Sequence, residues 1–367
     1  MNKIKDIIAS LEARWFMSSM ATGALGVLWT KMAAFFQIPE MNLVGIGFII
    51  IAFLLFIFAS IGYGFRLMHF YPLVKKDFLQ PATAKFFAGI SISLAVLSTG
   101  TTTVLVAQSI IPPVVGQWLA GILYGLSIIL GIFLLIGVCS TMIQSKENKI
   151  EQAIGVCLLP PVGLFVSIFA GNFWVQKFFA GTTLASNIGM FHLFLFALLI
   201  LLTSWILTFI VFRLRFYPLP QKEMAPSFFI PLAPAGVSII ALVSLLPLLN
   251  PSLPYQAIFK TMGFILIPMM ISFGIFWFLI ISRVMQSYLR AEGIPYSLGF
   301  WALVFPMAAF GISLFVSAQF LPGLAVLGWI GGVWGVLSTI LWGMVFVKTF
   351  KAVWSKKAFV RPPCLKH

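Results

Sequence analysis

The residues best able to contact a solute are the hydroxyls, glycines and prolines that interrupt long apolar stretches of this chain. Hydroxyls and glycines gather at residues 18–26 and 98–103, and prolines interrupt later stretches at Pro161, Pro234 and Pro306. A proline inside a helix removes an amide donor and frees a carbonyl, which neighbours, water or a cavity must satisfy. Hydroxyls and broken-helix backbone hold an ion weakly, and weak binding suits permeation.

Charged groups are absent from the middle of every apolar stretch, and this limits the chemistry. Proton relays across membranes normally use buried ionisable residues. His192 is the one ionisable group expected inside a span, near its end, and a relay role is not favoured. We therefore expect an anion site of hydroxyls, helix-end amides and the basic cytoplasmic field, without a fixed counter-ion.

Catalytic chemistry is not expected. Intramembrane proteases need a Ser–His pair, paired Asp or a metal triad within the membrane, and the apolar stretches supply none of these. The three cysteines match no zinc or redox motif. The sequence thus indicates neither an enzyme nor a metal or cofactor site.

The elements that must position these residues are membrane helices. The chain is 61% hydrophobic and 8% charged, with a mean hydropathy of +1.09. A spanning helix needs ~20 mainly apolar residues, and its backbone bonds are satisfied internally. We predict an all-α integral membrane protein with ten transmembrane helices at 13–35, 42–66, 84–109, 116–142, 151–170, 185–213, 227–249, 256–283, 297–319 and 323–349.

The loop charges predict the orientation. Twenty of the 23 Lys and Arg residues fall on one side of this topology, and only Lys31, Lys177 and Lys260 fall on the other. We expect residues 1–367 to form one polytopic domain of the cell membrane. By the positive-inside rule, its short N- and C-terminal tails are both cytoplasmic. Nucleic-acid binding is not indicated, because the charges are spread over six segments.

The odd and even spans differ in kind. Even spans carry bulky lipid-compatible runs, whereas odd spans are richer in small, hydroxyl and helix-breaking residues. One interpretation is close helix packing through small residues and interhelical hydrogen bonds. The favoured one is five helical hairpins, with odd helices lining a central pore and even helices outside. Its lining would include Ser19, Thr22, Gly23, Thr99, Thr102, Pro161, Gly163, Pro234, Gly236 and Pro306.

Several motifs resemble one family. The opening span carries WFMSSMATGALG at 15–26, and the ninth carries FWALVFPM at 300–307. The fifth and seventh spans carry LPPVG at 159–163 and LAPAG at 232–236. Together they resemble the tellurite-resistance/dicarboxylate transporter family, which includes fungal malate and sulfite permeases and plant slow-type anion channels. The sequence departs from the commoner pattern at Phe300, which replaces the first Trp of an aromatic pair.

The resemblance implies a homotrimer in which each protomer has its own five-helix pore. It also implies anion permeation and a pore gate formed by Phe305. The missing intramembrane charges favour a channel or uniporter for small inorganic anions or organic acids. A proton-linked transporter of a C4-dicarboxylate, sulfite or tellurite is the alternative, because a protonated substrate needs no protein carboxylate. The expected partners are a small anion and membrane lipid.

Overall fold

The computed structural model describes residues 3–144, 150–249, 254–291 and 293–359, and these fold into helices and connecting turns. Within them, nine helical segments have the length and apolar composition of a membrane span: Met41–His69, Pro81–Val106, Pro113–Gln144, Gly155–Phe178, Thr183–Phe216, Lys222–Leu248, Gln256–Arg290, Leu298–Phe320 and Val326–Trp354. Each overlaps one predicted span. The expectation of an all-α integral membrane protein is confirmed.

The first predicted span corresponds to α2 (Phe16–Phe36). This helix has 21 residues, enough to cross a bilayer. Its serines, threonines, glycines and Lys31 make it less apolar than the nine segments above. That α2 crosses the membrane as a tenth span stays a prediction.

Burial separates the helices into two groups, which we call inner and outer. In four segments of the inner group, 89–94% of the most apolar window is buried, against 22–44% in the outer group. The inner helices are α2, α6 (Ala88–Gly100) with its π-helical continuation η3 (Thr101–Val106), α8 (Leu159–Phe178), α10 (Leu232–Leu245) and α12 (Trp301–Phe320). The outer helices are α3 (Met41–His69), α7 (Pro113–Gln144), α9 (Thr183–Phe216), α11 (Pro254–Ala291) and α13 (Val326–Trp354).

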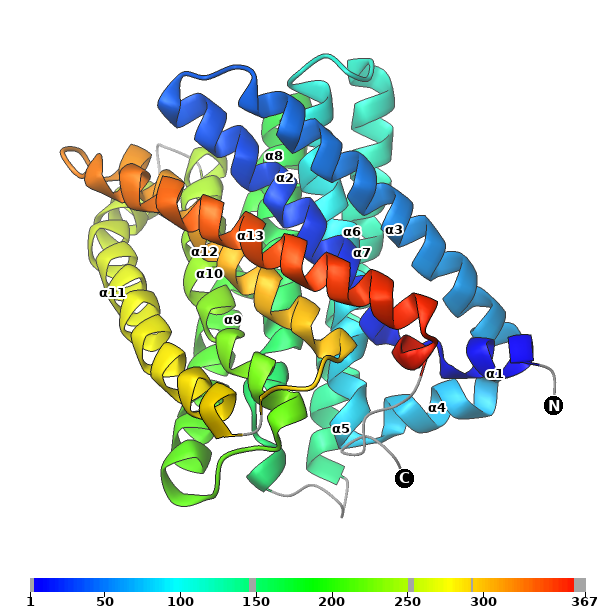
Figure 1. The fold of residues 1–367 in the computed structure, drawn as a ribbon. Coiled ribbons are helices and arrows are strands. Elements are labelled where there is room, and N and C mark those ends of the chain that lie inside the picture. The colour runs from blue at the N-terminus through cyan, green and yellow to red at the C-terminus, as the bar shows by residue number, and fades with distance from the viewer. Residues whose placement is uncertain (1–2, 145–149, 250–253, 292, 360–367) are drawn as a thin grey trace.

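The inner helices form a closed ring. Contacts run from α2 to α6, α8, α10 and α12 in turn, and α12 packs back against α2. Each outer helix packs against the inner helix that precedes it in the chain; α13 also crosses α2 on the face shown in Figure 1. The inner–outer alternation expected from residue character therefore exists in the packing.

Small residues let neighbouring backbones approach closely. A Cβ added to Gly26 of α2 would lie 2.9 Å from the carbonyl oxygen of Gly45 on α3, and the reverse distance is also 2.9 Å. On α10, a Cβ at Gly236 would lie 2.8 Å from Cα of Phe310 on α12. Such contacts between backbones are the usual use of small residues in membrane bundles.

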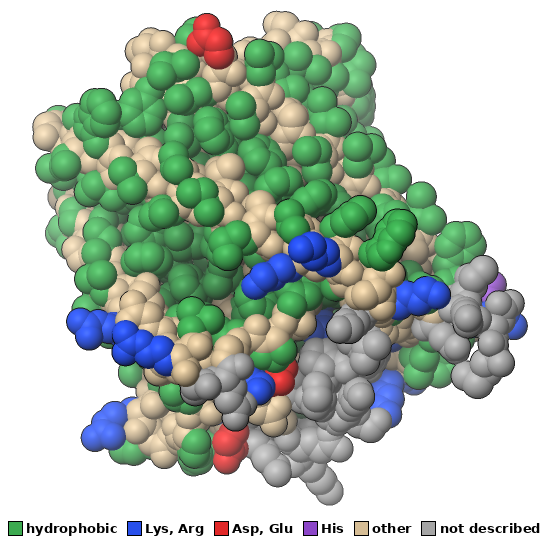
Figure 2. All heavy atoms as spheres, in the orientation of Figure 1, with side chains coloured by type: hydrophobic (Ala, Val, Ile, Leu, Met, Phe, Trp, Pro, Cys, Tyr) green, Lys and Arg blue, Asp and Glu red, His purple; other side chains and the backbone are tan. Residues whose placement is uncertain are grey.

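One end of the bundle, which we call the basic end, carries three short helices: α1 (Lys3–Ser10), α4 (Tyr71–Leu79) and α5 (Pro81–Ala84). Here the buried Arg66 side chain ties three helices together: Nη2 lies 2.6 Å from Oδ2 of Asp77 on α4, and Nε donates to the carbonyl of Ala9 on α1. The Lys and Arg side chains visible in Figure 2 lie mainly in the lower half of the molecule, toward the basic end. The opposite end of the bundle is called the far end.

Each inner helix begins at the basic end with a short 3₁₀ turn. These turns are η1 (Ala13–Trp15), η2 (Lys85–Phe87), η5 (Gly155–Leu158), η6 (Lys222–Phe229) and η8 (Leu298–Phe300). The remaining short turns are η4 (Ile150–Gln152), η7 (Leu246–Leu248) and η9 (Lys357–Phe359). Several residues that enter the charge and cysteine arguments lie outside the described residues: Lys146, Lys149, Arg361, Cys364 and Lys366.

Candidate functional site

A narrow cavity lies inside the ring toward the far end, and all five inner helices line it. We call it the far-end cavity. It has ≈ 20 Å³ of space for water-sized molecules, which is room for a water but not for a hydrated anion. Its lining residues are Ala24, Val27, Lys31, Val96, Thr99, Thr103, Phe169, Phe173, Val237, Ile240, Phe305, Ala309 and Ile312.

Helical spacing explains which side chains reach this cavity. Ala24, Val27 and Lys31 are separated by three and four residues, so they lie on one face of α2. Thr99 lies on α6, and Thr103 lies one turn further on in the π-helical η3. π-Helical turns in α-helices are rare and are found often at functional sites.

Phe305 contributes an aromatic side chain to the far-end cavity and is only 1% exposed. Pro306 follows it inside α12. Because proline has no amide hydrogen, the carbonyl of Ala302 loses its helical donor, and the helix is free to bend at this turn. Phe305 therefore lies beside a local weakness in the α12 hydrogen-bond ladder.

A second, smaller cavity of ≈ 10 Å³ lies at the basic end of the same ring. We call it the basic-end cavity. Residues at the starts of all five inner helices line it: Arg14, Phe86, Val156, Glu223, Met224, Pro226, Ser227, Ser297, Gly299 and Ala302. Five helix N-termini therefore converge on this cavity, and each carries a partial positive charge.

Arg14 is the basic residue of this second cavity, and its charge is compensated. Its guanidinium pairs with the carboxylate of Glu12, and both side chains are buried. The guanidinium carbon also lies 5.5 Å from the ring centroid of Phe86. These contacts fix Arg14 at the mouth of the ring.

The hydroxyls predicted on the first span face outer helices. Ser19 donates to the carbonyl of Ala52 on α3 at 2.8 Å, and Thr22 accepts from the indole of Trp342 on α13 at 2.9 Å. A Cβ at Gly23 would lie 2.6 Å from Val96 Cγ1 on α6. These contacts fit the packing interpretation, and a pathway role for the three residues stays a prediction.

Of the other predicted lining residues, some line a cavity and the rest make packing contacts. Phe305 and Thr99 line the far-end cavity. Thr102 is buried and donates to the carbonyl of Ser98 at 3.1 Å. A Cβ at Gly163 would lie 3.0 Å from the hydroxyl of Ser91 on α6. Neither cavity is lined by Pro161, Gly236 or Pro306, which are buried within the ring helices.

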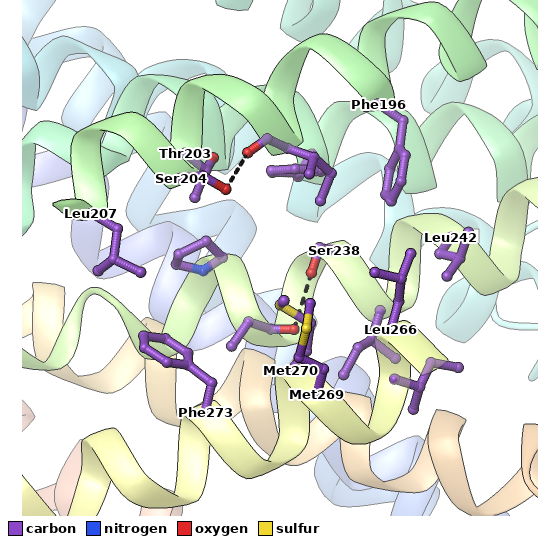
Figure 3. Close-up of a pocket in the computed structure, with 16 residues that line it drawn as sticks. Phe196, Thr203, Ser204, Leu207, Ser238, Leu242, Leu266, Met269, Met270 and Phe273 are labelled. Carbon is purple, nitrogen blue, oxygen red and sulfur yellow. Dashed lines mark hydrogen bonds between the residues drawn. The ribbon is translucent and has the colours of Figure 1, made fainter. Parts of the chain in front are cut away.

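Pro234 instead borders an apolar groove outside the ring, which Figure 3 shows. The groove holds ≈ 300 Å³ and lies between α9, α10 and α11, with Phe196, Leu207, Met270 and Phe273 among its walls. Three hydroxyls border it: Ser204 and Ser238 donate to carbonyls of their own helices, whereas the buried Thr203 hydroxyl has no hydrogen-bond partner among the described residues. A groove whose walls are mostly apolar, with one unpaired hydroxyl and no cation among the described lining residues, does not fit anion passage.

His192 belongs to a buried network, not to either cavity. Its Nε2 accepts from the hydroxyl of Tyr124 at 3.0 Å, and its Nδ1 donates to Oδ1 of Asn172 at 2.7 Å. Asn172 donates through Nδ2 to Ser244, whose hydroxyl donates to the carbonyl of Ala241. A neutral imidazole satisfies every member of this chain, which ends on a carbonyl and not on an acid.

Three charged residues that were not predicted as lining residues border the two cavities: Lys31, Arg14 and Glu223. Lys31 was assigned to a far-side loop and Arg14 to the N-terminal tail, yet both line the cavities. The expectation of an anion site without a fixed counter-ion stays a prediction. The spacing of the residues could have revealed the position of Lys31, because Lys31 falls seven residues after Ala24 and so lies on the same helix face.

Comparison with known proteins agrees with this architecture. Residues 10–350 match the family model described as SLAC1, voltage-dependent anion channel. Two proteins of Methanocaldococcus jannaschii, each named an uncharacterized transporter, are similar over almost their whole length. One is 26% identical over 364 residues, covering 96% of both chains. The other is 24% identical over 369 residues, covering 97% of this chain and 98% of the relative.

Proposed function

The chain belongs to the voltage-dependent anion channel family, and from this we propose that it forms a passive pathway, a channel or uniporter, for small anions. Membership places it among multi-pass membrane channels and transporters and not among enzymes. The proposed route runs along the axis of the inner ring, and the proposed gate is Phe305.

The observation that carries this proposal is the pair of cavities along one ring. All five inner helices line both the far-end cavity and the basic-end cavity. Phe305 borders the first, and Ala302, one turn earlier on α12, borders the second. Apolar constrictions block ions by excluding water. A buried Phe305 ring between two small cavities fits a closed pathway.

The electrostatics favour an anion at the basic end. Five helix N-termini surround the basic-end cavity, and each is equivalent to roughly half a positive charge. Glu12 offsets the charge of Arg14, and Glu223 also lines the cavity, so the helix ends supply the positive field. The positive-inside rule assigns this end to the cytoplasm, so both termini would be cytoplasmic. A solute that leaves the cell would therefore meet this field first.

The inner helices carry no carboxylate along their length, since Glu12, Glu40, Glu151 and Glu223 all lie outside them. A relay that moves protons through the protein lacks its usual groups. This supports passive transport over coupling through the protein. A carrier of protonated dicarboxylate, bisulfite or tellurite remains the alternative that the experiment must separate.

The test uses purified protein in liposomes. Chloride, nitrate, sulfite and malate fluxes are measured at equal pH and then with an imposed pH gradient. Passive transport predicts flux at equal pH that follows the electrical potential. Saturable uptake that appears only with the pH gradient would replace the channel proposal with the proton-linked carrier.

The family resemblance also supports a homotrimer in the cell membrane, with lipid around the outer helices. Large hydrophobic side chains are exposed along these helices, including Leu54, Phe133, Phe194, Ile265 and Val333. Either lipid or neighbouring protomers could cover them. The mass of the detergent-solubilised protein, corrected for bound detergent, tests this: a monomeric mass would contradict the trimer.

A further inference from the structure

Lys31 places a cation inside the membrane ring, far from the loops that hold most of the basic residues. It lies near the far end of α2, on the face shared with Ala24 and Val27, and lines the far-end cavity. Arg14 lines the other cavity on the same chain segment. The two residues are 17 positions apart, roughly 25 Å along a helix axis, which is close to the hydrocarbon thickness of a bilayer.

The two cations differ in their partners. Arg14 pairs with Glu12, so its charge is largely offset locally. In the part of the chain that the structure describes, Lys31 forms no ion pair, and no hydrogen bond of its ammonium group is found. A buried or half-buried charge without a partner is costly unless a solute or water compensates it.

Other polar groups of this cavity are already engaged. Thr99 donates to the carbonyl of Ala95 at 3.0 Å, and Thr103 donates to the carbonyl of Thr99 at 2.8 Å. Both threonines therefore spend their hydroxyl hydrogens on their own helix. The surface of the cavity itself is apolar, and among the described residues that line it Lys31 is the one whose side chain carries N–H groups, which a solute at the mouth can meet.

The direction of the inner helices gives a cation at the far end a role in anion passage. The inner helices begin at the basic end, so their C-termini and free carbonyls point toward the far end. Helix C-termini carry a partial negative charge, which repels anions. The ammonium group of Lys31, whose stem lines the far-end cavity, offsets that field at this mouth, where it would otherwise oppose anion passage.

We propose that Lys31 is the anion-binding residue of the far-end mouth. It holds a small inorganic anion or carboxylate through its ammonium group before or after the anion passes Phe305. This inference rests on the proposed function, because it assumes that anions move along the ring axis.

The test compares Lys31→Gln and Lys31→Arg with the unchanged protein in liposomes of neutral lipid. The half-saturating concentration is measured for each of chloride, nitrate, sulfite and malate that is transported, at constant ionic strength. Charged clefts raise local counter-ion concentrations by about ten-fold or more, so Lys31→Gln should raise the half-saturating concentration about ten-fold. Lys31→Arg keeps the charge and should stay close to the unchanged protein.

Lys177→Gln is the matched control, because Lys177 is exposed near the far end of α8 and does not line the cavity. It removes the same charge from the same end of the molecule. Equal effects of Lys31→Gln and Lys177→Gln would overturn a binding role and indicate general surface charge. An Arg variant that binds as weakly as Lys31→Gln would show that the positive charge at this position does not bind the anion.

These outcomes separate the two proposals. Flux that is present but insensitive to Lys31 would overturn this inference and leave the proposed function standing. If folded protein passes none of the four anions, even with the Phe305→Ala substitution, the proposed function fails and the assignment of Lys31 fails with it.

Discussion

Ala302 and Phe305 lie one turn apart on α12 and line different cavities: Ala302 borders the basic-end cavity and Phe305 the far-end cavity. Pro306 follows directly and leaves the carbonyl of Ala302 without its helical donor. The boundary between the two spaces therefore lies at the turn where α12 is weakest.

Removing the ring at this boundary should open the pathway. We expect Phe305→Ala to raise anion flux by about an order of magnitude or more, because an apolar plug is lost from a constriction. Flux per reconstituted protein in liposomes is the measurement.

Phe310 is the control for this substitution. Its ring packs against Trp334 with centroids 5.0 Å apart, on the side of α12 away from the cavities. Phe310→Ala should cost ~3–5 kcal/mol of stability without raising flux. Well-folded Phe305→Ala protein with unchanged flux would show that Phe305 is a packing residue.

The His192 network should support the fold and not proton transfer. His192→Ala leaves the Tyr124 hydroxyl and Asn172 Oδ1 without their partners in a buried region, at ~1–3 kcal/mol for each unsatisfied group. We expect a lower unfolding temperature in detergent, with flux per folded protein retained.

Tyr124→Phe removes one hydroxyl from the same network and should destabilise less. If His192→Ala abolished flux without changing stability, the histidine would have to act in transport. The structural assignment would then be wrong.

A substitution at Gly236 tests whether this glycine packs against a neighbouring helix or lines the pathway. A Cβ there would lie 2.8 Å from the Ala309 carbonyl oxygen and from Phe310 Cα, and backbone cannot move aside as a flexible side chain can. Gly236→Ala should therefore destabilise the protein by ~1–3 kcal/mol, the usual cost of overpacking.

Gly47 on α3 has no heavy atom within 4 Å of its added Cβ, and Gly47→Ala should be neutral or slightly stabilising in a helix. Thermal unfolding of both variants in one detergent makes the comparison. A Gly236→Ala protein of full stability would refute the tight α10–α12 contact.

The orientation can be tested by labelling single cysteines, after the three native cysteines are replaced. Positions Glu40 and Lys177 lie at the far end, whereas Gln221 lies at the basic end, and all three are exposed. An impermeant maleimide added to intact cells should label the first two and spare Gln221→Cys. Labelling of Gln221→Cys alone would reverse the orientation.

The sequence predicted the helices well because membrane spans have long, simple signals. Every predicted span overlaps a long helix, and the difference in residue character anticipated which helices are buried. The short helices α4 and α5 at 71–84 were missed, because amphipathic segments at a membrane edge lack that apolar length.

The direction of individual side chains was harder to predict. Ser19 and Thr22 are polar residues in a buried helix, which suited a pore, but their hydroxyls bond with outer helices. Residue type alone does not tell which helix face meets the axis. Lys31 was missed for a related reason: a charge near a span end looks like a loop residue until the face it occupies is considered.

The anchoring of α2 bears on how fast the pathway can change. On one side α2 meets α3 backbone to backbone at Gly26 and Gly45. On another side, the indoles of Trp29 and Trp342 join α2 to α13 through hydrogen bonds to Thr339 and Thr22. Moving α2 would drag two outer helices through lipid, and collective helix motions are slow, on microsecond to millisecond time scales. Rotation of the Phe305 ring moves no backbone. If this ring is the gate, we expect the pathway to open briefly and often.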